Sequence, residues 1–138
     1  LEQCTIADSR QTAGSAVECV EGSNVYMYDT IIAFTVGGSS VDCEGGAAAV
    51  LSCSDVFGNE GGDWVGGIAG QLGLAGNISE DPLFCRELNP VFPYTLSVTS
   101  PCAPEQNPGC GLIGAWDAAC GETPVEVRSW GRVKAMYR

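Results

Sequence analysis

Short segments of alternating apolar and polar residues recur along the first sixty positions of the chain. Val17-Glu18-Cys19 and Val41-Asp42-Cys43 alternate with a period of two, and Gly, Ser, Asn and Asp separate such segments. This alternation is typical of half-buried β-strands, and β-branched or aromatic residues fill many of the apolar positions. No window in residues 1–62 has apolar residues at helical spacing without an interrupting glycine. The pattern predicts short strands joined by tight corners.

These segments repeat at a nearly constant interval. The stretch from Ser15 matches the stretch from Ser39 at a spacing of 24 residues, with Val17 on Val41, Glu18 on Asp42 and Cys19 on Cys43. Residues 4–7 match residues 30–33 at a spacing of 26, and residues 33–34 match residues 56–57 at 23. One coil of strands and corners per repeat predicts a β-solenoid.

Several motifs resemble a known family, the secreted right-handed parallel β-helix repeat proteins. The segments TIIAF, SDVFGN, GGDWVGG, GNISEDPLF, SPCAP, CGLIGAW and SWGRVKAMYR resemble the last coils and the C-terminal end of such proteins, over nearly the whole chain. The resemblance implies an all-β fold, a right-handed parallel β-helix with an irregular, loop-rich C-terminal cap.

The predicted organisation is one domain and a tail. Residues 1–127 form the β-helix with its capping region, in which residues 1–60 are regular coils and residues 61–127 are a long loop and the cap. The Gly-rich segment 61–76 is expected to fold its apolar side chains back over the solenoid. Residues 80–121 hold six of the seven prolines and are expected to seal the C-terminal end, because proline cannot donate to a further strand. The apolar side chains of the Gly-rich segment are Trp64, Val65, Ile68 and Leu72.

Charge is divided unevenly between these parts. The whole chain has 17 acidic and 6 basic residues, a net charge of −11, but residues 1–127 carry −15 and residues 128–138 carry +4. Aromatic and apolar residues recur at helical spacing in this tail, which is compatible with a short amphipathic helix. The expected role is docking on the acidic solenoid of the same chain or of a neighbour, with a surface-attachment signal or a simple hydrophobic plug as alternatives. The candidate residues are Arg128, Trp130, Arg132, Lys134, Tyr137 and Arg138.

The composition excludes several classes of function. A protein that neutralises nucleic-acid phosphates needs clustered cations, and before residue 128 the chain has only Arg10 and Arg86. The chain has no histidine, which removes Ser-His-Asp and Cys-His catalysis. A polysaccharide lyase needs Arg or Lys at its site, so we expect no enzymatic activity. No stretch is apolar enough for a membrane span.

The eight cysteines contain no CxxC pair, so a zinc site is disfavoured and an oxidising, extracellular location is expected. Adjacent coils of a parallel solenoid lie about 4.8 Å apart, which suits a disulfide between Cys19 and Cys43, although stacked free thiols are an equal alternative. Cys4 and Cys53 are expected to share a column two coils apart, which bars a bond between them. Further disulfides are expected among Cys85, Cys102, Cys110 and Cys120, including Cys110 with Cys120.

One candidate binding feature lies on the outer surface. Glu18 and Asp42 should stand one coil apart on the outside, where a bound Ca²⁺ would relieve their repulsion and a solvated acidic face is the plainer alternative. Calcium is therefore the one cofactor considered, and otherwise no cofactor is expected. Phe34 and Phe57 are expected to stack in one column as core residues.

The expected function is a non-catalytic extracellular structural or surface module. Residue 1 falls in the middle of a repeat, so an uncovered first coil is expected, where a second copy could pair in a homo-oligomer or filament; removed upstream coils or proteolytic maturation are the alternatives. The alternative function is a carbohydrate-binding or carbohydrate-cleaving surface on the solenoid flank, with a glycan as partner and with or without calcium.

Overall fold

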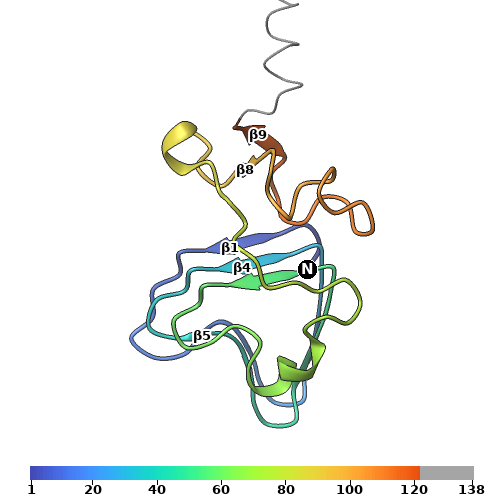
Figure 1. Cartoon of the computed structure of the whole chain (residues 1–138). Helices are drawn as coiled ribbons and strands as arrows, with labels where there is room; N and C mark the ends of the chain where they lie inside the picture. The colour runs from blue at the N-terminus through green and yellow to red at the C-terminus, as the bar shows by residue number, and fades with distance from the viewer. Residues whose placement is uncertain (122–138) are drawn as a thin grey trace, which may run out of the picture.

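The computed structural model describes residues 1–121, in which short parallel strands stack in coils (Figure 1). One sheet contains β1 (Thr5–Ala7), β4 (Ile31–Ala33) and β7 (Asp55–Phe57). The second pairs β2 (Ser15–Cys19) with β5 (Ser39–Cys43), and the third pairs β3 (Asn24–Tyr28) with β6 (Ala48–Ser52). All of these pairings are parallel, and the described residues form almost no helix. The predicted fold class, a parallel β-solenoid, is confirmed.

The register between coils follows the repeat in the sequence. Val17 pairs with Val41 and Cys19 with Cys43, at the predicted spacing of 24, and residues 5–7 pair with residues 31–33 at the predicted spacing of 26. The spacing of 23 was wrong: Ala33 pairs with Phe57 at 24, so Phe34 and Phe57 do not share a column. Within one pair of strands the spacing is constant, and the third sheet also keeps 24 residues between partners.

Side chains at alternate positions of each strand point inward and fill the interior of the coils. Met27 and Leu51 point inward from β3 and β6, and Ile32 and Val56 from β4 and β7, and all four are almost fully buried. Burying each such side chain contributes about 1.5–3 kcal/mol. The stack of equivalent apolar positions therefore produces one continuous core inside the coils.

Buried asparagines satisfy the backbone at the corners. Asn77 accepts a hydrogen bond from the N–H of Ser54 (3.1 Å) and donates one to the carbonyl of Leu51 (2.8 Å). Asn59 likewise accepts from the N–H of Thr35 (3.0 Å) and donates to the carbonyl of Ile32 (3.0 Å). An unpaired buried backbone group costs about 1–3 kcal/mol, so these amides hold the turns in place.

The Gly-rich segment closes the end of the second and third sheets, as predicted. Its short 3-10 helix η1 (Gly66–Gln71) packs on β5 and β6 with Ile68 buried in the core. The side-chain amide of Gln71 accepts from the N–H of Leu51 and donates to the carbonyl of Ala49, both at 2.8 Å, in place of a further strand. Trp64 packs against the same core, but Val65 and Leu72 are exposed rather than folded back.

The Pro-rich segment lies on a flank of the solenoid rather than sealing its end. Figure 1 shows β8 (Leu96–Ser97) and β9 (Ala118–Cys120), with the short 3-10 helix η2 (Arg86–Leu88) before them, beyond the sheet of β1 and β4. Ile31 and Ala33 face outward and form a second buried cluster with Leu96, Cys102 and Ile113. This cap, residues 80–121, therefore covers the outer face of one sheet. The expected end seal is instead supplied by η1.

Candidate functional site

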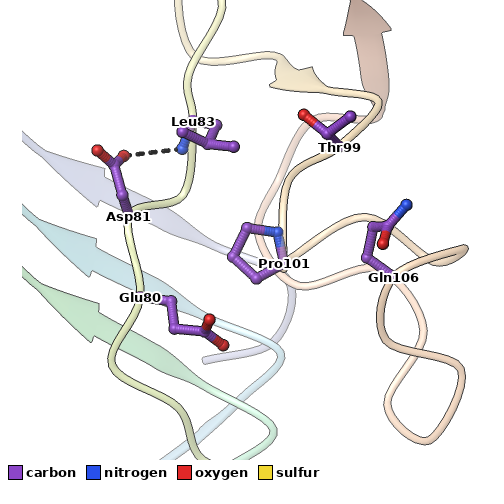
Figure 2. A pocket seen from close by; sticks show the side chains of 6 residues that line it. All are labelled: Glu80, Asp81, Leu83, Thr99, Pro101 and Gln106. Carbon is purple, nitrogen blue, oxygen red and sulfur yellow. Dashed lines mark hydrogen bonds between the residues drawn. The ribbon is translucent and has the colours of Figure 1, made fainter. Parts of the chain in front are cut away.

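A cleft separates two segments of the cap (Figure 2). One wall comes from the connection between the last coil and the cap, and it carries Glu80, Asp81 and Leu83. The other wall carries Thr99, Pro101 and Gln106, and the cleft has a volume of about 460 Å³. Asp81 is fixed by its own wall, because its carboxylate accepts a hydrogen bond from the N–H of Leu83 (2.9 Å). The cleft is thus a polar, acidic concavity of a size suited to a small ligand.

A fully buried carboxyl group, Asp55, connects the two walls. One oxygen accepts a hydrogen bond from the N–H of Glu80 (3.0 Å), on the first wall. The other accepts from the thiol of Cys102 (3.1 Å), which follows Pro101 on the second wall. Burial raises the pKa of Asp55 from 3.8 to about 7, against the lowering effect of these two hydrogen bonds. Burial also raises the pKa of the Cys102 thiol.

A second polar cluster joins the cap to the first coil. Arg86 donates two hydrogen bonds to the carboxylate of Asp8, at 3.0 and 3.2 Å, and the Tyr94 hydroxyl donates a third at 2.7 Å. The guanidinium carbon lies 5.2–5.8 Å from the ring centres of Phe34, Phe84 and Tyr94. Burial acts to raise the pKa of Asp8, but the hydrogen bonds from Arg86 and Tyr94 outweigh it and lower that pKa. We call this cluster of Asp8, Arg86 and Tyr94 the clasp. We interpret it as a structural contact, because its polar atoms are already paired.

The outer face of β3 and β6 is uncharged and partly aromatic. Tyr26 and Tyr28 are 50% and 41% exposed, and Val50, paired with Tyr26, is 45% exposed. Side chains two residues apart on a strand share a face and lie about 7 Å apart. The two tyrosines therefore form a small platform open to solvent.

The two residues suggested for calcium are exposed neighbours in the structure. Glu18 pairs with Asp42 in the register, and both line a shallow pocket of about 220 Å³ with Glu44. Glu18 also accepts a hydrogen bond from the N–H of Ser15 (3.1 Å). Within residues 1–121, no three side chains of His, Cys, Asp or Glu are grouped closely enough to hold a metal ion.

The cysteine pairs are partly as expected. The structure joins Cys19 to Cys43, the bridge that the column geometry allowed. Cys110 pairs with Cys53 and Cys120 with Cys85, so the expected bond between Cys110 and Cys120 was wrong. The physical reason is that the cap folds back on the start of the third coil, the coil that contains β7, which places the Cα atoms of residues 53 and 110 at 5.6 Å from each other.

Two cysteines in the described chain are free. The expectation of a disulfide at Cys102 was wrong, because its thiol is buried and donates a hydrogen bond to Asp55. Cys4 is free and half-buried, and it precedes Thr5, which pairs with Ile31. Cys4 therefore lies in the column of Thr30 and Ser54, so the shared column with Cys53 was also wrong.

Several residues of interest escaped the sequence interpretation. Asp55 occupies the column of Ile31, so an acidic residue at an apolar position of the repeat was the available signal. Arg86 is one of only two cations before residue 128, which was a weaker signal for the clasp. Asn77 heads an Asn-Ile-Ser glycosylation motif, but its amide is buried and fully hydrogen-bonded. The six docking candidates of the tail, residues 128–138, lie outside the described residues.

The geometry defines a class, a disulfide-linked parallel β-solenoid with a cap on one flank. Comparison of the chain with protein-family models, with curated proteins and with solved structures found no match. In the described part of the chain, no helix has the length and apolar character needed to span a membrane. Three disulfides in one small domain are typical of proteins from oxidising compartments, which points to an extracellular location.

Proposed function

We propose that this chain is a non-catalytic structural module of an extracellular protein. The observation that carries the proposal is the distribution of its disulfides. One joins two adjacent coils, one joins the third coil to the cap, and one joins the two ends of the cap. Together they cross-link two coils to each other, the solenoid to the cap, and the cap within itself. Such cross-linking suits a rigid element that must survive outside the cell, where reducing systems are absent.

The arrangement of the cleft supports the absence of catalysis. Glycoside hydrolysis needs two carboxyl groups on opposite sides of the scissile bond. In the cleft, the carboxylates Glu80 and Asp81 are adjacent on one wall, and the facing wall offers Thr99, Pro101 and Gln106. The described residues also bring no Arg or Lys side chain into this cleft.

Self-association is part of the proposal, and the structure suggests its form. Among residues 1–121, the far edges of β5 and β6 are covered by η1 and Gln71, whereas β1 and β2 pair with no strand on the opposite side. A filament that joins unlike ends needs both edges free. We therefore propose a dimer that pairs like edges of β1 and β2, rather than a filament.

Three measurements test the structural role. Peptide mapping of secreted protein without reduction should recover the three disulfides, and light scattering over a range of concentrations should detect the dimer. A panel of neutral and acidic polysaccharides should show no cleavage. Free thiols at all six bridged positions would contradict the extracellular role. Turnover of any polysaccharide would contradict the non-catalytic role. A monomer at the highest concentration would contradict the dimer.

A second candidate function is binding of a neutral glycan on the outer face of β3 and β6. The specific observation is the pair Tyr26 and Tyr28, half-exposed on a face to which β3 and β6 contribute no charged side chain and at whose edge Glu2 pairs with Tyr28. Sugar rings stack on aromatic rings, and an uncharged platform favours neutral sugars. Binding of an oligosaccharide series should be lost in Tyr26→Ala and retained in Leu88→Ala, an exposed apolar residue of the cap.

The same titration tests the role of calcium. Glu18 and Asp42 are paired in the register of adjacent coils, so the titration is repeated with calcium and with a chelator. Equal affinity in the two conditions would remove the calcium-dependent form of this proposal. No binding of any neutral oligosaccharide would remove the glycan function itself.

A further inference from the structure

The buried pair of Asp55 and Cys102 differs from an ordinary structural contact. Both residues are 0% exposed, and they come from β7 and from the cap, 47 residues apart in sequence. The carboxyl group receives two hydrogen bonds, from the N–H of Glu80 and from the thiol of Cys102. A thiol is a weak donor, so a carboxylate at this position is poorly compensated for its loss of water.

The charged groups around Asp55 make its ionisation harder still. Glu80, on the segment that follows the last coil, and Asp63, in the loop before η1, both act on Asp55 as like charges. The neighbouring strand positions in the sheet are Ile31 and Ile78, which are apolar. No cation of residues 1–121 forms an ion pair with Asp55. The site therefore accommodates a neutral carboxylic acid better than a carboxylate.

The position of Asp55 makes its charge consequential for the cap. Its two hydrogen bonds reach both walls of the cleft, and the same walls are also joined by the Ser100 hydroxyl, which donates to the carbonyl of Pro82. Cys102 in turn accepts, through its backbone carbonyl, the N–H of Ile113 at the centre of the second buried cluster. A charge on Asp55 therefore affects the contact that holds the cap against β7.

We propose that Asp55 and Cys102 form a pH-sensitive latch that holds the cap on the third coil when Asp55 is protonated and loosens it when Asp55 is ionised. Opening brings water to the carboxylate and parts the two walls of the cleft. The cap stays attached, because the disulfide between Cys53 and Cys110 ties the two parts covalently. The step is a reversible loss of one proton from the Asp55 carboxyl group to solvent.

The direction and range of the effect follow from linkage. Burial raises the pKa of Asp55 to about 7 in the closed form, and in the open form the group returns toward its ordinary value of 3.8. Between these values the closed form holds a proton that the open form has lost, so opening becomes more favourable as pH rises. The opening equilibrium should increase about 50-fold between pH 5 and pH 7 and level off above pH 7.

Amide hydrogen exchange of the full chain, corrected for the intrinsic pH dependence of exchange, measures this opening. The reporters are the amides of Ile113 and Cys102, which hydrogen-bond to Cys102 and Ser100 respectively. Their protection should fall about 50-fold from pH 5 to pH 7. The amides of β2 and β5 should change much less, and Asp55→Asn should abolish the pH dependence at the reporters.

Two outcomes would overturn the latch. One is an equal pH dependence of the reporter amides in wild type and Asp55→Asn. The other is a carbon-13 titration of the wild-type Asp55 carboxyl group with its midpoint near 4, which needs no variant. Asp42→Asn is the control, since Asp42 is an exposed carboxylate of β5, and the reporter amides should keep their pH dependence in this variant.

Discussion

The disulfide between Cys53 and Cys110 is the covalent tie between the solenoid and the cap, so its removal is the most informative single perturbation. The other two disulfides act within one part each, Cys19 with Cys43 in the coils and Cys85 with Cys120 in the cap. We predict that replacing Cys53 and Cys110 with alanine destabilises the whole domain and uncouples the cap from the coils.

The size of the effect follows from the length of the loop that the bond closes. Closing a loop of 57 residues lowers the entropy of the unfolded chain. This stabilises the folded state by about 4 kcal/mol at 25 °C. The 24-residue loop of Cys19 and Cys43 is worth about 3.4 kcal/mol on the same scale. Removing the Cys53–Cys110 bond should therefore lower the free energy of unfolding slightly more than removing the Cys19–Cys43 bond.

Urea unfolding followed by circular dichroism and by tryptophan fluorescence measures both effects. The two parts are followed separately in backgrounds that keep one tryptophan and replace the other two with phenylalanine: Trp64 packs on the solenoid core, Trp116 lies in the cap against Phe92, and Trp130 is the third. We expect a loss of about 4 kcal/mol in the free energy of unfolding and an earlier transition for the cap fluorescence. Cys4→Ala, which removes a free thiol, is the control and should stay near wild type.

The reasoning is refuted if the double variant unfolds with wild-type stability in one transition. It is also refuted if Cys4→Ala loses as much free energy of unfolding as the double variant, because the loss would then not come from loop closure.

Three further changes probe other contacts, each measured by the free energy of unfolding in urea. Asn77→Ala leaves two buried backbone groups unpaired and should cost about 2–4 kcal/mol, whereas the exposed Asn24→Ala should cost little. Gly38→Ala places a Cβ 1.9 Å from the carbonyl oxygen of Gly14, so the coils must separate locally, at a cost of about 1–3 kcal/mol or more. Arg86→Ala removes a half-exposed ion pair and the aromatic contacts, so the free energy of unfolding should fall by about 1–2 kcal/mol, and by less at high salt. An unchanged free energy of unfolding would refute the stabilising role of the clasp.

The strand pairing was predictable because, in a parallel solenoid, the spacing of the sequence repeat sets which residues pair between coils. Val17 on Val41 and Cys19 on Cys43 are visible at a spacing of 24, and the structure pairs the same residues. That register allowed either a bridge between the two cysteines or a pair of stacked free thiols, and the structure has the bridge. The error at Phe34 arose where the match was two residues long and a shift of one residue scored as well as the true register.

The cap was not predictable in the same way, because its contacts do not repeat. Cys110 is only ten positions from Cys120, and the sequence favoured that short loop, yet the chain carries Cys110 back to Cys53. The free thiol of Cys102 and the clasp of Asp8 with Arg86 likewise join segments 47 and 78 residues apart. No local pattern encodes such distances.

By itself, the sequence determined the period of the coils, the register of Val17 and Cys19 and the acidic body, and its eight cysteines favoured an oxidising setting. The tertiary structure decided where the cap lies and therefore which groups lost contact with water. Asp55 shows the difference: in sequence it is one of seventeen acidic residues, and only the cap above β7 makes it buried. Burial depends on contacts between distant segments, and the pKa of Asp55 depends on burial.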